Sequence, residues 1–292
     1  MSNILNNIKK DFLRQNILNK LIYINIGLFL CFSILNVFSF MFQFELNSTL
    51  NKLYLPAENT ILIKQPWSLL TYMFLHKGII HLALNMIWLY FAGKIFIEYL
   101  KPEQLLSIYL LGGISGGLLF IIAYNYIPVL EPLLSNVKAI GASASVLAVM
   151  VAIATYLPNY NVNLPLIGNI PLKLIAIVCV ILDILSIPSE NTGGHIAHLG
   201  GAFFGYIYIK QLKKKNTSSN FIKFLIKKLN SIFKRKTKVK SIYKRKNSDY
   251  EFNKKRAEHQ KKIDNILEKI AKSGYDSLNK VEKDLLFTES KK

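Results

Sequence analysis

Long apolar segments alternate with short polar ones over the first two thirds of this 292-residue chain. A helix needs roughly 20 apolar residues to cross the hydrocarbon layer of a membrane. Six segments are predicted as membrane helices: Leu21–Phe42, Ile79–Leu100, Glu103–Tyr124, Ser143–Leu157, Leu172–Ile187 and His195–Leu212. The fourth and fifth are shorter, as a helix enclosed by other helices can be, and prolines mark their ends: Pro158, Pro171 and Pro188. The pattern therefore predicts an all-α membrane protein built as a six-helix bundle.

Charge is separated from hydrophobicity along the chain. The sequence is 51% apolar with a mean hydropathy of +0.28, yet its formal net charge is +20. From Lys210 onward, 26 lysines and arginines stand against nine acidic residues, so +17 of that charge lies in the tail. A soluble globular domain seldom combines these properties, so the composition favours a membrane domain followed by a basic tail.

The basic residues also predict an orientation, because cytoplasmic flanks of membrane helices are enriched in Lys and Arg. Both ends of the chain are basic, and an even number of helices places them on one side. The loops assigned to the outer side carry few or balanced charges: 43–66, 125–140 and 188–194. The first of these loops mixes apolar and polar residues and is expected to lie in the membrane interface. We predict both termini in the cytoplasm and, for a bacterial protein, a location in the inner membrane.

No small-residue cleavage site follows the first apolar segment, which favours an anchor over a removed signal peptide. Cys31 and Cys179 each lie within an apolar segment. Their positions form neither a disulfide framework nor a metal-ligand spacing, so both are expected to be small buried residues. We expect no metal ion and no cofactor.

Polar side chains inside membrane helices are costly, so each is a candidate functional residue. His81 and Asn85 are four residues apart in the second predicted helix and share one face. They could direct hydrogen-bond donors at a common point. The alternative is that they only join neighbouring helices by hydrogen bonds.

Ser143 opens the fourth predicted helix. Free backbone N–H groups and the helix dipole favour a developing negative charge at that position, which suits a nucleophile whose attack creates an oxyanion. The alternative is an ordinary helix-capping serine. Ser145 lies two residues further on, faces another way and is the weaker candidate.

His198 lies in the sixth predicted helix, one turn before Gly201. Gly201 and Gly205 form a small-residue face that allows close helix packing, so this face carries an imidazole toward a neighbour. His195, three residues earlier, is the rival base. A serine, a histidine and a donor pair are together the parts that acyl transfer requires. Asp183 is the one buried acidic candidate, and without a matching motif a Ser143–His198 dyad is the simpler hypothesis.

These motifs, taken together, resemble the rhomboid family of intramembrane serine proteases. The resemblance covers roughly Trp67 to Leu212. It rests on three motifs in order, one in each of the second, fourth and sixth helices: His76, His81 and Asn85; Gly141 to Ala144; and Ala197, His198, Gly201 and Gly205.

The resemblance implies a six-helix bundle with a water-filled cavity open to the outer side. It assigns Ser143 as nucleophile and His198 as general base. Asn85 and the Ser143 N–H would stabilise the oxyanion, with His81 as a further candidate donor, and His195 would be a neighbour of the base. The implied substrates are membrane proteins, cut within or beside a transmembrane segment.

Three positions depart from the family pattern. Ser68 follows Trp67 where an arginine is frequent, and Ala144 follows the nucleophile where a glycine is frequent. Leu147 stands where a tyrosine often packs on the catalytic histidine. These departures concern the anchoring of the first loop and the positioning of the histidine.

The tail from Lys213 to about Asn247 interleaves lysines with apolar residues. We predict an amphipathic segment on the anionic inner leaflet, and favour this over nucleic-acid binding, which is not expected. Apolar residues at helical spacing on both sides of Gly274 predict a small helical hairpin. The predicted organisation is a cytoplasmic N-terminus, a membrane domain, a basic linker and a helical module: 1–20, 21–212, 213–250 and 251–292.

Two other functions were weighed against an intramembrane endopeptidase. A rhomboid-like pseudoprotease would bind membrane proteins without cutting them, but such proteins typically lack the serine or the histidine, and this chain has both. A transporter is less favoured, because the segments show neither an inverted repeat nor ion-pathway acids.

Overall fold

A computed structural model describes residues 16–164, 168–214 and 246–289, and the chain divides into two compact units, Met1–Lys234 and Arg235–Lys292. Each unit is described by itself. Most of the basic linker predicted at 213–250 lies outside the described residues.

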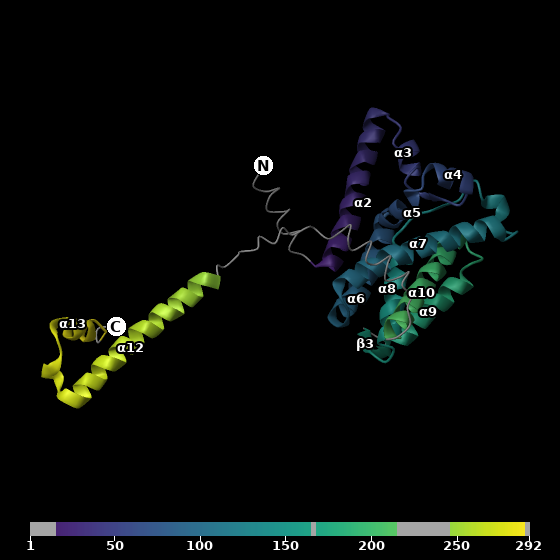
Figure 1. The fold of residues 1–292 in the computed structure, drawn as a ribbon. Coiled ribbons are helices and arrows are strands. Elements are labelled where there is room, and N and C mark those ends of the chain that lie inside the picture. The colour runs from purple at the N-terminus through teal and green to yellow at the C-terminus, as the bar shows by residue number, and fades with distance from the viewer. Residues whose placement is uncertain (1–15, 165–167, 215–245, 290–292) are drawn as a thin grey trace. The chain divides into compact units, whose positions relative to one another are not determined.

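Each of the six predicted membrane segments corresponds to one helix of the first unit, with bounds that differ by at most four residues (Figure 1). The bounds are α2 Ile17–Phe42, α6 Ile79–Tyr99, α7 Pro102–Tyr126, α8 Ser143–Tyr156, α9 Leu172–Leu185 and α10 Thr192–Lys213. Within the described residues, α2, α6 and α7 are long and apolar enough to cross a membrane, and α8 is a shorter apolar helix. This finding supports an integral membrane protein, and the count of six spans stays a prediction.

Local sequence accounts for several helix boundaries. Asn16 caps α2 by accepting a hydrogen bond from the Asn19 N–H at 2.9 Å, and Gln43 ends that helix with a left-handed φ of 50°. Pro102 occupies the first turn of α7, where its missing N–H costs no intrahelical hydrogen bond.

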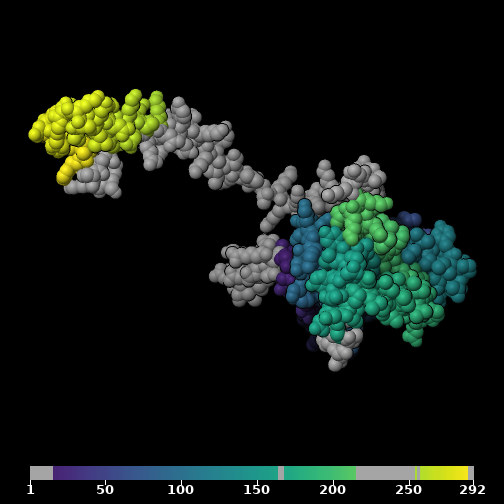
Figure 2. All heavy atoms as spheres, turned by 90° about the horizontal axis from the view of Figure 1, so that it is seen from below, coloured from purple at the N-terminus to yellow at the C-terminus, as the bar shows by residue number. Residues whose placement is uncertain are grey.

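Helix α8 lies at the centre of the first unit and is buried over most of its length, so its 14 residues need not match the full thickness of a membrane. It packs against α6, α7, α9 and α10, while α10 also packs along α7. Their buried side chains form one hydrophobic core, and Figure 2 shows the outer surface of the unit from one side.

Glycines set the closest helix contacts. A Cβ added to Gly201 or Gly205 of α10 would collide with the backbone carbonyls of Ala144 and Ala148 in α8. Gly116 of α7 lies equally close to the carbonyl of Ala197 in α10. The small-residue face predicted for the sixth helix is therefore the surface on which α8 and α10 meet.

The connection between α2 and α6 contains short elements: α3 Asn47–Asn51, β1 Leu55–Pro56, α4 Asn59–Lys64, α5 Ser68–Thr71 and η1 Tyr72–Phe74. After α7, η2 Glu131–Leu133 leads to β2 Lys138–Ala139, which pairs antiparallel with β1. The Trp67 indole donates to the Lys52 carbonyl at 2.9 Å, and Ser68 is fully buried. The Trp67 bond ties the connection together internally, and the pairing of β1 with β2 joins it to the segment after α7, although no arginine follows Trp67.

A two-stranded hairpin, β3 Asn161–Leu164 and β4 Gly168–Pro171, joins α8 to α9. The second unit contains α12 Lys246–Ser273, η3 Tyr275–Ser277 and α13 Lys280–Glu289. Gly274 breaks the two helices apart with a φ of +78°, and Ile266 and Leu278 are buried between them. The Lys269 ammonium also pairs with the Glu282 carboxylate at 3.0 Å.

Candidate active site

Ser143 is the first residue of α8 and is half-buried. The chain enters α8 through Gly141, whose φ of +131° is a conformation that favours glycine. The Gly141 N–H donates to the Tyr72 carbonyl at 3.0 Å, which fixes this entry. Ser143 therefore stands at a helix N-terminus, as the sequence predicts, with the free N–H groups of the first turn beside it.

His81 of α6 faces the same entry. A Cβ added to Gly141 would lie 2.9 Å from His81 Nε2 and 3.7 Å from Ser143 Oγ. Gly141 thus keeps open the space between the His81 ring and the Ser143 hydroxyl. The structure brings these two predicted site residues together.

Asn85 lies one turn further along α6 and is buried. Its side-chain Nδ2 donates to the His81 carbonyl at 2.8 Å, within the helix. One of the two amide hydrogens is used in that bond, so one remains for another acceptor.

His198 is half-buried on α10, one turn before Gly201. Because Gly201 lies against Ala144, the turn that carries His198 is held beside the N-terminus of α8. The described residues contain no hydrogen bond between Ser143 and His198, and such bonds often tighten only when substrate is bound.

Asp183 is a residue to which sequence reasoning gave no role. It lies in the last turn of α9, and its Oδ1 is 2.7 Å from His198 Nδ1 and 2.8 Å from His195 Nδ1. A carboxylate only accepts hydrogen bonds, so both Nδ1 atoms donate and His198 Nε2 is left as an acceptor. The Ser143–His198 dyad stays a prediction, and the structure adds an acidic partner for its histidine.

The available sequence signal for Asp183 was its position as an acidic residue within an apolar segment. No motif linked it to His198, 15 residues away on another helix. Only the packing of α9 against α10 shows the contact.

The structure also shows the surroundings of the alternative nucleophile, Ser145, and of two residues that depart from the family pattern, Leu147 and Ala144. Ser145 is fully buried and its Oγ lies 3.7 Å from Met73 Sδ, so it faces another neighbour than His198 does. Leu147 is buried in the hydrophobic core, and the aromatic neighbour of His198 is the His195 ring, with centroids 5.8 Å apart. The methyl group of Ala144 packs at Gly116 of α7.

Asp183, His195 and His198 also offer nitrogen and oxygen atoms within 4.8 Å of one another, a set that could bind a metal ion. The two hydrogen bonds to Asp183 account for this arrangement of side chains without one.

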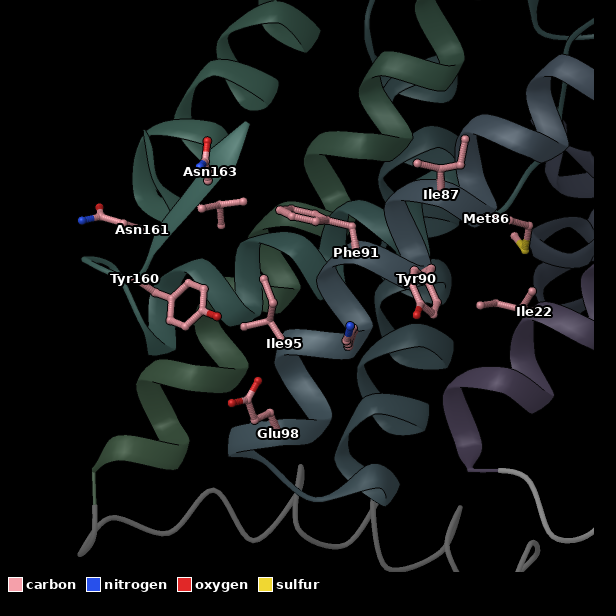
Figure 3. A pocket seen from close by; sticks show the side chains of 12 residues that line it. Ile22, Met86, Ile87, Tyr90, Phe91, Ile95, Glu98, Tyr160, Asn161 and Asn163 are labelled. Carbon is pink, nitrogen blue, oxygen red and sulfur yellow. The ribbon is translucent and has the colours of Figure 1, made fainter. Parts of the chain in front are cut away.

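A separate groove of about 690 Å³ lies between α2, α6 and the segment that leads into β3 (Figure 3). Ile22 of α2, Tyr90 and Glu98 of α6, and Tyr160 and Asn161 line it. None of the predicted catalytic residues lines this groove.

Comparison with known proteins shows the family of this chain. Residues 64–215 match the Rhomboid domain family, and residues 246–292 match a family of unknown function. The chain belongs to the rhomboid family, which confirms the resemblance carried by the motifs.

Three relatives share part of this chain. RHOMBOID-like protein 12, mitochondrial, of Arabidopsis thaliana is 31% identical over 156 residues, covering 50% of this chain and 46% of that protein. Presenilin-associated rhomboid-like protein A, mitochondrial, of Danio rerio is 31% identical over 144 residues, covering 47% and 35%. RHOMBOID-like protein 7 of Arabidopsis thaliana is 29% identical over 162 residues, covering 55% and 48%. The chain thus matches less than half the length of each of these relatives.

Proposed function

We propose that this protein is an intramembrane serine endopeptidase that cleaves transmembrane proteins within or beside their membrane segment. The observation that carries the proposal is the contact between Gly201 and the Ala144 carbonyl. This contact holds the α10 turn with His198 against the α8 turn that begins at Ser143. Membership of the rhomboid family supports the same activity.

In the proposed reaction, His198 Nε2 takes the proton of the Ser143 hydroxyl as Oγ attacks the carbonyl carbon of the scissile peptide. The carbonyl becomes an oxyanion in a tetrahedral intermediate. When this collapses, the peptide C–N bond breaks and His198 gives its proton to the leaving amine. Water then attacks the acyl-enzyme, with His198 again as base, and releases the acid product and free Ser143.

The oxyanion requires donors aimed at the place where the charge develops. The N–H of Ser143 lies at the N-terminus of α8, where the helix dipole favours negative charge. The remaining Asn85 amide hydrogen is the second donor, and His81, beside Gly141, is a third.

The test is cleavage of a tagged single-pass membrane protein by purified wild type, Ser143→Ala and His198→Ala in proteoliposomes. Both variants should lose cleavage, and Ser145→Ala is the matched control, because its hydroxyl faces Met73 and should be dispensable. A serine-directed fluorophosphonate should label wild type and Ser145→Ala but not Ser143→Ala. Equal cleavage by Ser143→Ala and wild type would show that the assignment is wrong.

A further inference from the structure

The carboxylate of Asp183 lies between two imidazoles on a neighbouring helix. Asp183 is 8% exposed, and its helix, α9, is otherwise almost entirely apolar. Burying a charged group is costly unless it is paired, so a carboxylate here requires partners. His195 and His198, three residues apart on one face of α10, supply both of them.

The groups around this carboxylate are few. His195 and His198 face it from α10, and Cys179 lies one turn earlier on α9 itself. Beyond His198, the next imidazole is His81 of α6. Among the described residues no lysine or arginine pairs with Asp183, so the two imidazoles are its hydrogen-bond donors.

We infer that Asp183 is a positioning residue for the base, an inference that rests on the proposed protease function. By accepting the Nδ1–H of His198 at 2.7 Å, it holds the imidazole in the tautomer whose Nε2 can take the Ser143 proton. It also stabilises the imidazolium that forms when the proton moves. Asp183 itself touches neither the nucleophile nor the peptide.

His195 has a different part in this arrangement. Its Nδ1–H donates to the same oxygen of Asp183 at 2.8 Å, so it fixes the carboxylate rather than the base. Leu147 stands where a tyrosine often packs on the catalytic histidine. The hydrogen bond to Asp183, whose carboxylate is fixed by His195, therefore orients His198 in place of ring stacking.

The experiment compares Asp183→Asn with His195→Ala and with Glu190→Gln. The asparagine amide would donate to His198 Nδ1 and so leave the proton on Nε2, where it blocks acceptance from Ser143. We expect kcat per folded enzyme to fall by about 10²- to 10⁴-fold, the usual contribution of a general base, with KM within about twofold.

His195→Ala keeps the bond between Asp183 and His198, so its kcat should fall by less than about fivefold. Glu190→Gln removes an exposed carboxylate from the turn between α9 and α10 and should behave as wild type. If Asp183 only joined α9 to α10, Asp183→Asn and His195→Ala would lose thermal stability alike and keep kcat per folded enzyme. That result would overturn the positioning role.

A measurement on the unmodified enzyme covers the case in which Asp183→Asn fails to fold. With ¹⁵N-labelled histidine, one strongly deshielded Nδ1–H signal should vanish in His198→Ala. Finding His198 protonated on Nε2 instead would overturn the inference. If Ser143→Ala still cleaves the substrate, the proposed function itself is wrong. If Ser143→Ala loses cleavage while Asp183→Asn keeps a normal kcat, only the role of Asp183 is contradicted.

Discussion

At the scale of single residues, the proposed role of Asn85 as an oxyanion donor depends on one amide hydrogen. Its amide already donates to the His81 carbonyl, so only the second N–H can reach an oxyanion. Asn85→Ala should lower kcat by about 10²-fold, the usual cost of removing one oxyanion donor, with little change in KM. Steady-state cleavage kinetics measure this, and a change confined to KM would point to substrate binding instead.

His76, in the turn before α6, gives the molecule a dependence on pH. Burial and the neighbouring His81 imidazole, 5.2 Å away between ring centroids, lower the pKa of His76 to about 4. The unfolded chain takes up this proton at a pKa of about 6.5, so between these two pH values the unfolded state binds more protons. The free energy of unfolding should therefore fall as the pH is lowered from about 6.5 to 4.

The variant His76→Gln removes this titration. Its thermal midpoint in detergent should decline less than that of wild type over the same pH range. Parallel declines in the two proteins would show that His76 does not carry the effect.

Site residues that belong to short sequence motifs could be predicted, whereas those that meet only through tertiary packing could not. Ser143 and His198 stand in short motifs next to glycines whose packing role can be recognised in the chain. Asp183 and His198 meet only because α9 packs on α10, and this contact follows from tertiary structure that no short motif encodes. The left-handed Gly141 entry beside His81 was likewise visible only in three dimensions.

At the scale of elements, the contact between α8 and α10 depends on the absence of side chains at its glycines. A Cβ at Gly205 would collide with the Ala148 backbone carbonyl, which cannot turn aside as a side chain can. Gly205→Ala should therefore destabilise the folded protein by about 1–3 kcal/mol. The thermal midpoint in detergent measures this.

Gly27 of α2 offers a matched control, because a Cβ added there meets nothing within 4 Å. Gly27→Ala makes the same chemical change within a helix and should be neutral or slightly stabilising, because alanine favours helix more than glycine does. If the two variants had the same thermal midpoint, the close contact at Gly205 would not contribute to the stability of the folded protein.

The helices were predictable because each long apolar segment carries its own signal, and the observed bounds differ from the predicted ones by a few residues. Helix α10 begins at Thr192, three residues before the predicted start, since the glycines there are not apolar but are still helical. The pairing of β1 with β2 was not predictable, because two strands of two residues carry no periodicity. Their pairing depends on residues 55 and 139, which only the fold brings together.

At the scale of the whole molecule, the proposed chemistry belongs to one unit. All of Ser143, His198, Asn85, His81 and Asp183 lie within residues 64–215, the part that matches the Rhomboid domain. Deleting residues 246–292 should therefore leave the cleavage rate in proteoliposomes within about twofold of wild type. A large loss would show that the second unit contributes to catalysis or to substrate capture.

The direction of the chain through the membrane follows from the number of helices that cross it. If α2, α6, α7, α8, α9 and α10 all span the membrane, both ends of the chain lie on one side, and the basic flanks make that side the cytoplasm. Single cysteines, introduced into a protein that carries Cys31→Ser and Cys179→Ser, measure accessibility at four positions. Ser2→Cys and Ser273→Cys report on the two ends of the chain, and Glu131→Cys and Ser189→Cys report on the α7–α8 and α9–α10 connections. An impermeant maleimide added to intact cells should label only the latter two, and labelling of all four should follow lysis. If Ser2→Cys and Ser273→Cys differed in accessibility, the number of spans would be odd, which would contradict the six-span arrangement.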